Sequence, residues 1–252
     1  MKKENFSDLS IYTTTLYKED KVSKLRQKLA ARFLENAANL GVRCIIVDGG
    51  SNEKFLNKVH SYKNVELVII PKLKMGISRR KALKLAVNRS DTSYFLWSEP
   101  EKYDLIRPIS LKKMIWKLRK NTADIVVPRR LSKNSYPKLQ AQLETKANAK
   151  AKELMGDNFK LKGELDLWFG PKMFNRTGAN FFLNYKGRLD KWDVIIKPVI
   201  LAFQKGKRIC SVDVDYTHDI LQSSAETGDK SMETKRLEQY MMILAELENK
   251  FK

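Results

Sequence analysis

The chain has 252 residues, of which 42% are hydrophobic and 31% are charged, and its formal net charge is +20. This composition is typical of a soluble globular protein, and the length suits one large domain or two small ones. Because no apolar run approaches the ~20 residues of a membrane span and no signal peptide is recognisable, we expect a cytoplasmic protein. Cys44 and Cys210 fall in apolar runs, which predicts buried free thiols.

Strands and helices alternate through the first half of the chain. Short apolar runs predict strands over 9–15, 42–48, 65–70, 93–97 and 123–128. Apolar residues at helical spacing predict helices between them, over 22–40, 49–59, 77–88 and 111–120. This alternation indicates a mostly parallel sheet flanked by helices on both faces, an α/β fold of the Rossmann-like kind.

The second half of the chain is less regular. A helix without a strong apolar face is predicted over 138–156, and an irregular aromatic segment over 164–174. A helix kinked at Pro198 is predicted over 192–206, then a last strand over 208–219 and a C-terminal helix over 226–251. We find no internal repeat and no low-complexity linker, so we expect a single domain over 1–252.

Positive charge is concentrated in one part of the chain. Residues 107–160 hold 14 Lys and Arg but 4 Asp and Glu, which is half of the net charge in about a fifth of the sequence. Such a patch attracts polyanions, which are nucleic acid, anionic lipid headgroups or phosphorylated substrates. A solvated surface without a partner is the alternative.

Polar residues follow two of the predicted strands, at the edge where open α/β sheets bind ligands. Asp48 precedes paired glycines, and it either accepts hydrogen bonds from a ligand or forms an Asx turn. Gly76 and then Arg79 and Arg80 begin the helix after the third strand. Arginines in a first helical turn oppose the helix dipole unless an anion is bound; pairing of one arginine with a carboxylate is the alternative.

Glu99 and Glu101 follow the strand that Pro100 ends. Each either holds a metal ion or is a loop charge, and a third alternative for Glu101 is pairing with Lys102. His218, beyond the last strand, is either a ligand or a satisfied imidazole. The motifs CxxC, HExxH, GxGxxG and GxxxxGK[ST] are absent from the sequence, so P-loop chemistry is unsupported.

Four segments resemble, in order, the motifs of family 2 glycosyltransferases. "CIIVDGGSNEKF" is similar to their Asp-rich loop, "GISRRKALKLA" to their Gly-x-Ser helix start, and "SYFLWSEPE" to their strand ending in Asp-x-Asp. "DKWDVIIKPVILAFQKGKRICSVDVDYTHD" resembles their acidic helix start and, in the mannosylglycerate synthase type, a strand leading to a metal-binding His. The resemblance spans Leu9 to Asp219. It implies a GT-A fold with a mixed, mostly parallel sheet and an enzyme that moves a sugar from a nucleotide-diphosphate donor to a hydroxyl acceptor.

The resemblance also implies a role for particular residues. Donor binding falls to Thr13, Asp48, Gly76, Arg79, Arg80, Ser98 and Lys102. Mg²⁺ or Mn²⁺ is held by Glu99 and His218, the acceptor is held by Trp168, Gly170 and Trp192, and Asp193 is the catalytic base. Residues 9–130 are then the nucleotide-sugar-binding half, 131–230 the acceptor and metal half, and 231–252 the C-terminal helix.

Departures from the family pattern leave alternatives. Trp97 stands at the first Asp of Asp-x-Asp, and Gly49 replaces the second acid of the Asp-rich loop, so basic residues can take over the phosphate charge. A non-catalytic GT-A relative that binds nucleic acid or an anionic membrane is the alternative function. Nucleic acid is the less expected partner, because zinc ligands and an aromatic RNP-like strand are lacking, whereas the basic patch suits peripheral membrane contact. A nucleotidyltransferase is disfavoured because "TTTLYKEDK" carries no glycine.

Overall fold

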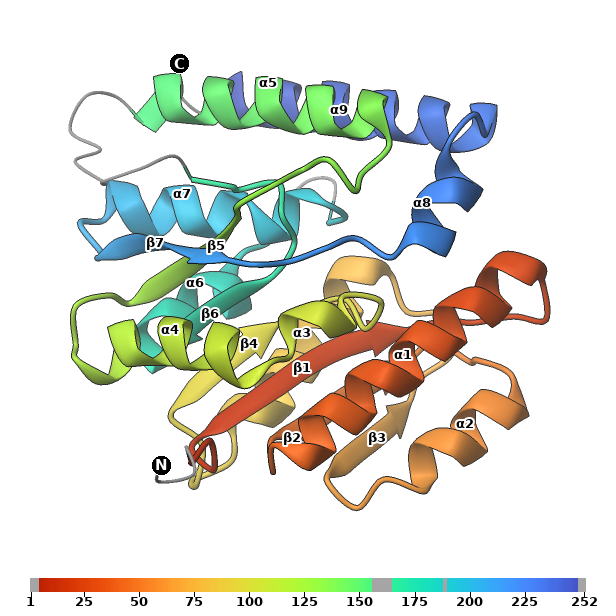
Figure 1. Ribbon diagram of the computed structural model, residues 1–252. Helices are drawn as coiled ribbons and strands as arrows, with labels where there is room; N and C mark the ends of the chain where they lie inside the picture. The colour runs from red at the N-terminus through yellow and green to blue at the C-terminus, as the bar shows by residue number, and fades with distance from the viewer. Residues whose placement is uncertain (1–4, 156–164, 188–189, 249–252) are drawn as a thin grey trace.

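The computed structural model describes residues 5–155, 165–187 and 190–248 (Figure 1). Within them, seven strands form one sheet in the order β3-β2-β1-β4-β6-β5-β7. The strands are β1 (Leu9–Thr15), β2 (Arg43–Asp48), β3 (Val65–Ile69), β4 (Tyr94–Trp97), β5 (Ile125–Arg130), β6 (Lys172–Asn175) and β7 (Ile209–Val214). Only β6 runs antiparallel to its neighbours in the described part of the sheet. The predicted α/β class with a mixed, mostly parallel sheet is confirmed.

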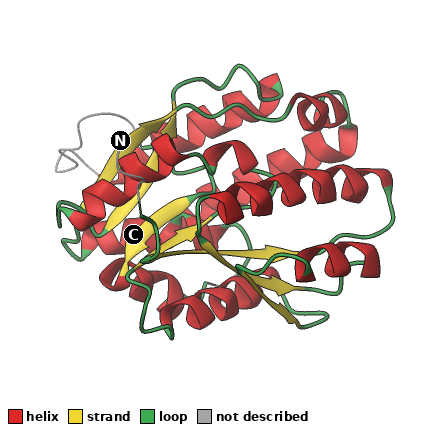
Figure 2. Ribbon diagram, turned by 60° about the horizontal axis from the view of Figure 1, so that its bottom comes forward, coloured by secondary structure: helices red, strands yellow, loops and turns green. Residues whose placement is uncertain are grey.

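Helices cover both faces of this sheet (Figure 2). They are α1 (Lys21–Asn39), α2 (Glu53–His60), α3 (Met75–Val87), α4 (Pro108–Arg119), α5 (Lys138–Met155), α6 (Arg176–Asn184), α7 (Lys197–Gln204), α8 (Ile220–Glu226) and α9 (Lys230–Glu248). Helices α5 and α9 lie side by side over α7 (Figure 1). The last predicted residues of the C-terminal helix, 249–251, lie outside the described residues.

The sheet separates two apolar cores because successive side chains of a strand point to opposite faces. In β1, Leu9 and Ile11 pack in the core with Phe33 of α1, whereas Tyr12 packs in the other core with Leu83 of α3. Cys44 is buried in the first of these cores, Cys210 is half-buried beside it, and both thiols are free as predicted. None of the described helices is long and apolar enough to cross a membrane.

Three expectations for the second half of the chain were wrong. The segment expected to be irregular contains the start of β6, whose four residues are too short and too polar to signal a strand. Pro198 lies in the first turn of α7 and kinks nothing, because a proline is tolerated where no intrahelical N–H bond is lost. The last strand ends at Val214, and α8 follows it.

Strand β5 also runs beyond its expected end at Pro128. A proline in a strand removes one backbone donor. It is accommodated here because β6 pairs only with Ile125 and Val126, so Pro128 has one neighbouring strand, β7. Arg129 and Arg130 therefore continue the strand toward its carboxyl end.

Gly178 of α6 provides a test of how closely this helix must approach β5. A Cβ at this position would lie 2.5 Å from the carbonyl oxygen of Asp124 and 2.7 Å from the Cβ of Phe174. Because the first of these is backbone, we expect Gly178→Ala to lower the free energy of unfolding by about 1–3 kcal/mol, measured by urea denaturation. Thr177→Ala, at an exposed position of the same helix, should leave it nearly unchanged.

Candidate functional site

A cavity of about 460 Å³ lies at the carboxyl edge of the sheet. Leu16, Gly49 and Glu99 reach it from the segments that follow β1, β2 and β4. Because β6 is antiparallel, the segment that precedes it lies at this same edge, and Trp168, Phe169 and Gly170 join the wall. Open α/β sheets bind their ligands at this edge.

The structure brings seven of the predicted site residues together at this cavity and leaves six outside its wall. Those that line it are Arg79, Glu99, Lys102, Trp168, Gly170, Trp192 and His218. Those that do not are Thr13, Asp48, Gly76, Arg80, Ser98 and Asp193. The predicted donor, acceptor and metal groups thus contribute to one space, while the predicted base does not reach it.

Asp48 is fully buried and its carboxylate is occupied by its own turn. It accepts hydrogen bonds from the backbone N–H groups of Gly50 at 2.8 Å and Ser51 at 2.7 Å. The hydroxyls of Thr15 and Ser51 donate to its other oxygen at 2.6 Å and 2.5 Å. This is the Asx-turn alternative, and it makes Asp48 the anchor of the loop that carries Gly49 to the cavity.

The two arginines of α3 have different partners. Arg80 forms an ion pair with Asp190, with a 3.0 Å bond from Nη2 to Oδ2, and donates to the carbonyl of Tyr185. Arg79 lies over the ring of Trp97, 4.6 Å from its centroid, and its Nε has no hydrogen-bond partner. Burial lowers the pKa of Arg79, although Glu99 opposes this shift. Arg79 is therefore the arginine available to an anion in the cavity.

Three further predicted donor-binding residues lie outside the cavity wall: Thr13, Ser98 and Gly76. The buried Thr13 hydroxyl has no partner, and the Ser98 hydroxyl donates to the carbonyl of Glu99 at 3.1 Å. The Gly76 N–H donates to the carbonyl of Asp190 at 3.0 Å, and a side chain at Gly76 would collide with Asp190. Gly76 thus lets the first turn of α3 approach the segment that pairs with Arg80.

Glu99 lies among cations at the cavity wall. The Lys102 ammonium is 3.8 Å from Glu99 Oε2, and this oxygen is buried without a hydrogen-bond partner. Burial alone would raise the pKa of Glu99, but Lys102, Arg79 and Lys172 outweigh it, and the pKa is lowered. Glu99 is consequently ionised at neutral pH. Glu101 accepts a hydrogen bond from the Tyr17 hydroxyl and pairs with Arg26, so its partner is not Lys102, which was one of the alternatives.

Lys172 is a completely buried cation beneath the same wall. Its ammonium donates to the carbonyls of Leu167, Phe169 and Gly170. Burial lowers its pKa to about 7, although Asp166 and Glu99 favour the charged form. Three carbonyl bonds from one ammonium hold the segment before β6 in a tight curve, and this curve presents Gly170 to the carboxylate of Glu99.

His218 is buried with both ring nitrogens unpartnered. Its ring stacks on Tyr136 at 4.3 Å between centroids and 13° between planes. Burial and the nearby Lys102 lower its pKa to about 3. His218 is therefore neutral at pH 7 and can accept or donate one hydrogen bond to a ligand. The alternative, an imidazole whose hydrogen bonds are satisfied within the protein, is not what the structure shows.

Glu99 and His218 are the predicted metal ligands. A hard divalent cation takes six or more oxygen ligands. Among residues 5–155, 165–187 and 190–248, no three His, Cys, Asp or Glu side chains gather closely enough to hold a metal ion. Of the two predicted ligands, Glu99 is the carboxylate, and the Lys102 ammonium lies 3.8 Å from its Oε2. These residues do not fit Mg²⁺ or Mn²⁺, and the ligand roles of Glu99 and His218 have no support from this geometry.

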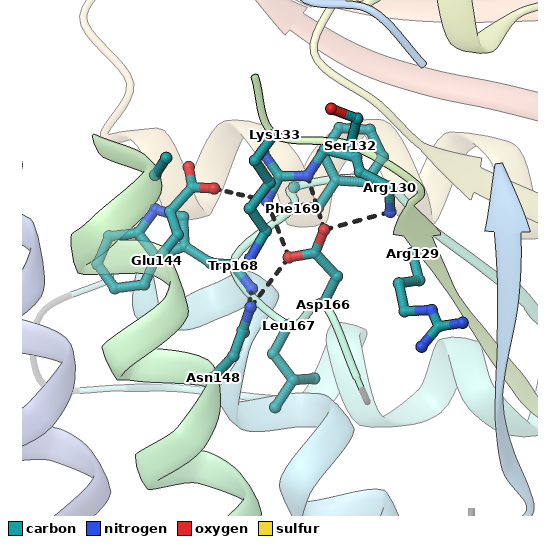
Figure 3. Close-up of polar contacts among 12 residues, drawn as sticks. Arg129, Arg130, Ser132, Lys133, Glu144, Asn148, Asp166, Leu167, Trp168 and Phe169 are labelled. Carbon is teal, nitrogen blue, oxygen red and sulfur yellow. Dashed lines mark hydrogen bonds and ion pairs between the residues drawn. The ribbon is translucent and has the colours of Figure 1, made fainter. Parts of the chain in front are cut away.

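Arg130, at the end of β5, has a fully buried side chain that pairs with Asp166 and Glu144 (Figure 3). Its guanidinium donates to Asp166 at 2.6 Å and 2.8 Å and to Glu144 of α5 at 2.5 Å. It lies between the rings of Tyr136 and Phe169, 4.6 Å and 4.7 Å from their centroids. Burial opposes its charge, but Glu144 and Asp166 raise the pKa of Arg130 well above its ordinary value.

Asp193 has partners of its own outside the cavity. It is 1% exposed, and it accepts hydrogen bonds from the Tyr185 hydroxyl at 2.7 Å and from the Lys191 N–H at 2.8 Å. These bonds hold the turn that places Trp192 in the wall. The geometry makes Asp193 a positioning residue, and its predicted role as a base is untested.

Sequence reasoning missed several residues that line the cavity. These are Arg26 from α1, Arg130, Tyr136, Gln140 and Glu144 around β5 and α5, and Lys235, Arg236 and Gln239 from α9. Arg130 is the last residue of β5, and a basic residue at a strand end is a local pattern that could have identified it. No local pattern marks the residues of α9. Among the described residues, six cationic and three carboxylate side chains line the cavity, an excess of three positive charges.

Neither a protein-family model nor a curated protein sequence matches the chain. Solved structures do match. Glucosyl-3-phosphoglycerate synthase from Mycobacterium tuberculosis, solved with Mn²⁺, uridine diphosphate and glucosyl-3-phosphoglycerate, is 11% identical; the match covers 96% of this chain and 80% of that one, with a TM-score of 0.66.

Two further solved structures also match this chain. A nucleotide-diphospho-sugar transferase from Desulfovibrio desulfuricans is 11% identical, with 96% of this chain and 99% of that one covered and a TM-score of 0.52. A 4-diphosphocytidyl-2C-methyl-D-erythritol synthase from Anaerococcus prevotii is 14% identical, with 86% and 96% covered and a TM-score of 0.53. The chain has the GT-A fold of nucleotide-diphospho-sugar transferases, and identities this low show the fold alone.

The ionised carboxylate of Asp166 makes the free energy of unfolding depend on pH. Burial would raise the pKa of Asp166, but the bonds from Arg130 lower it to about 2, below the ordinary value of 3.8. A carboxylate with a depressed folded pKa stabilises the protein above its unfolded pKa, by about 2 kcal/mol here, and this contribution is lost as the pH falls from about 4 to about 2. We expect Asp166→Asn to lower the free energy of urea unfolding at pH 7, and the difference from wild type to shrink toward pH 3.

Glu153→Gln is the matched control for this experiment. Glu153 lies on α5, is exposed and pairs with Lys150 at the surface, where ion pairs contribute little. Its unfolding free energy should follow the wild type at both pH values. An Asp166→Asn difference that stays constant from pH 7 to pH 3 would contradict the assignment of the ionised carboxylate as the stabilising form.

Proposed function

We propose that this protein is a glycosyltransferase that moves a sugar from a nucleotide-diphosphate donor to a hydroxyl acceptor. One observation carries the proposal: on a GT-A sheet, the cavity at the carboxyl edge combines Arg79 and Lys102 with the tryptophans Trp97, Trp168 and Trp192. Cations suit a diphosphate, and flat aromatic rings suit a sugar or a base.

In the proposed reaction, the bond between the sugar and the diphosphate breaks and its electron pair stays on the phosphate oxygen. The acceptor hydroxyl forms the new bond to the sugar carbon, and its proton passes to water. Negative charge therefore grows on the departing nucleoside diphosphate. Arg79 and Lys102, which line the same part of the wall as Glu99, are positioned to stabilise that charge in a partly water-excluded site.

Two alternatives receive less support. The GT-A fold also occurs in a synthase of a diphosphocytidyl compound, but the segment after β1 has no glycine for a loop that would wrap a triphosphate. Nucleic acid binding would need cationic residues along an extended open surface. The cations described above instead converge on one cavity.

Intrinsic fluorescence tests the proposal directly. Three of the four tryptophans line the cavity, and the fourth, Trp116, is 49% exposed on α4. Titration with UDP, GDP or their sugars should quench the emission for one nucleotide class, and the matching sugar donor should release nucleoside diphosphate when an acceptor is supplied. Trp168→Phe should remove much of the quench, whereas Trp116→Phe should leave it unchanged. Quenching carried by Trp116 would place binding elsewhere.

A specific surface favours membrane contact as an addition to this activity. Ile109, Lys112, Lys113, Trp116 and Lys120 are exposed and recur at helical spacing along α4 and its C-cap. An aromatic and an apolar side chain among lysines suit the headgroup layer of an anionic bilayer. We propose that this stripe docks the protein on such a surface.

Vesicle co-sedimentation tests the stripe. Because each lysine near an anionic surface contributes ~1 kcal/mol, replacing Lys112, Lys113 and Lys120 together with Glu should weaken binding to phosphatidylserine-containing vesicles at least about 100-fold. Lys205→Glu, at the exposed end of α7, is the control. Equal binding to neutral and anionic vesicles would overturn the docking surface and leave the proposed transferase activity untouched.

A further inference from the structure

The wall of the cavity around Glu99 already holds positive charge on several sides. The Lys102 ammonium lies 3.8 Å from Glu99 Oε2 and 5.4 Å from the centroid of the Phe169 ring. Arg79 is fixed over Trp97 on another side. The buried Lys172 ammonium lies beneath, bonded to the carbonyl of Gly170, where an added Cβ would collide with the Glu99 carboxylate.

This arrangement is the reverse of what a divalent cation requires. A metal site gathers carboxylates and neutral ligands so that anionic oxygens surround the ion. Here one carboxylate is surrounded by two arginine or lysine side chains at the cavity wall and a third cation below it. A divalent ion beside Glu99 would meet the Lys102 ammonium at nearly the distance of a direct ion pair, where like charges repel.

The cations have room for an anion because their own partners are few. Arg79 donates from Nη1 to the carbonyl of Lys191 at 3.2 Å, but its Nε is unpartnered. Glu99 pairs with Lys102, and the positive charge of Arg79 is near enough to help lower the pKa of Glu99. The neighbouring Arg130 forms ion pairs with two carboxylates, Asp166 and Glu144, although its Nη1 has no hydrogen-bond partner. Arg79 and Lys102 share one nearby carboxylate, Glu99, and can therefore still attract an anion in the cavity.

We propose that this cavity binds the diphosphate of its donor without a divalent metal ion, with the Lys102 ammonium and the Arg79 guanidinium neutralising the phosphate charge. Glu99 then holds these two cations in place before the donor arrives and contributes no metal ligation. The proposal rests on the proposed function, because it needs a nucleoside diphosphate as the ligand. It assigns this chain a different chemistry from the Mn²⁺ complex of the structurally similar synthase.

The test is calorimetric titration of UDP and GDP into the full-length protein, once with Mn²⁺ and once with EDTA at equal ionic strength. The proposal expects affinities that differ by less than about threefold between the two conditions. Lys102→Gln should weaken binding about 10–100-fold, the loss expected when a charge-assisted bond to phosphate is removed. Lys205→Gln makes the same charge change at the exposed end of α7 and should leave the affinity unchanged.

Glu99→Gln distinguishes the two chemistries by the sign of its effect. If Lys102 and Arg79 neutralise the diphosphate, removing the carboxylate charge removes a repulsion, and binding in EDTA stays equal or tightens. If Glu99 is a metal ligand, the same variant loses binding that Mn²⁺ had supported. The comparison of wild type in Mn²⁺ and in EDTA needs no variant, so it decides the matter even where a substitution prevents folding.

The outcomes separate this inference from the proposed function. Binding that survives EDTA and is lost in Lys102→Gln supports both. Binding that requires Mn²⁺ and is lost in Glu99→Gln overturns the metal-free inference and leaves the glycosyltransferase proposal standing. Absence of binding to UDP, GDP and their sugars under both conditions overturns the proposed function, and the inference falls with it.

Discussion

The buried guanidinium of Arg130 is the constraint on which the site depends. A charge taken out of water must be paired, because an uncompensated buried ion costs several kcal/mol. Arg130 finds its two carboxylates on different segments, Glu144 on α5 and Asp166 before β6. The end of β5, the helix α5 and the aromatic segment must therefore come together in one arrangement, and that arrangement is one wall of the cavity.

The reversed direction of β6 completes this wall. A parallel strand delivers the residues that follow it to the carboxyl edge of the sheet, as β4 delivers Glu99. An antiparallel strand delivers the residues that precede it, so Trp168 and Gly170 reach the same edge through the pairing of Trp97 with Lys172. Lys172 then bonds the carbonyls of that segment from below. One strand of opposite direction thus joins two distant parts of the sequence in a single site.

Local sequence was enough to predict the parallel strands and the residues at their ends, because buried apolar runs and strand-end loops are properties of short windows. Partners could not be predicted in the same way. Arg80 pairs with Asp190, 110 positions later in the chain. The carboxylate of Asp48 accepts hydrogen bonds within its own turn and is not left for a ligand. Strand β6 was missed because four residues with a buried lysine carry no strand pattern. Long-range charge pairing decided which predicted residues were left for a ligand.

The contribution of α9 to the cavity has a consequence for the order in which the protein is made. Lys235, Arg236 and Gln239 come from the last described helix, after every described strand of the sheet. Since domains begin to fold while the ribosome is still translating them, a nascent chain can complete its sheet and still have an open site. The wall closes only when α9 has left the ribosomal tunnel and packed on α5. Ligand binding by this protein is therefore a property that arises only after α9 has been synthesised.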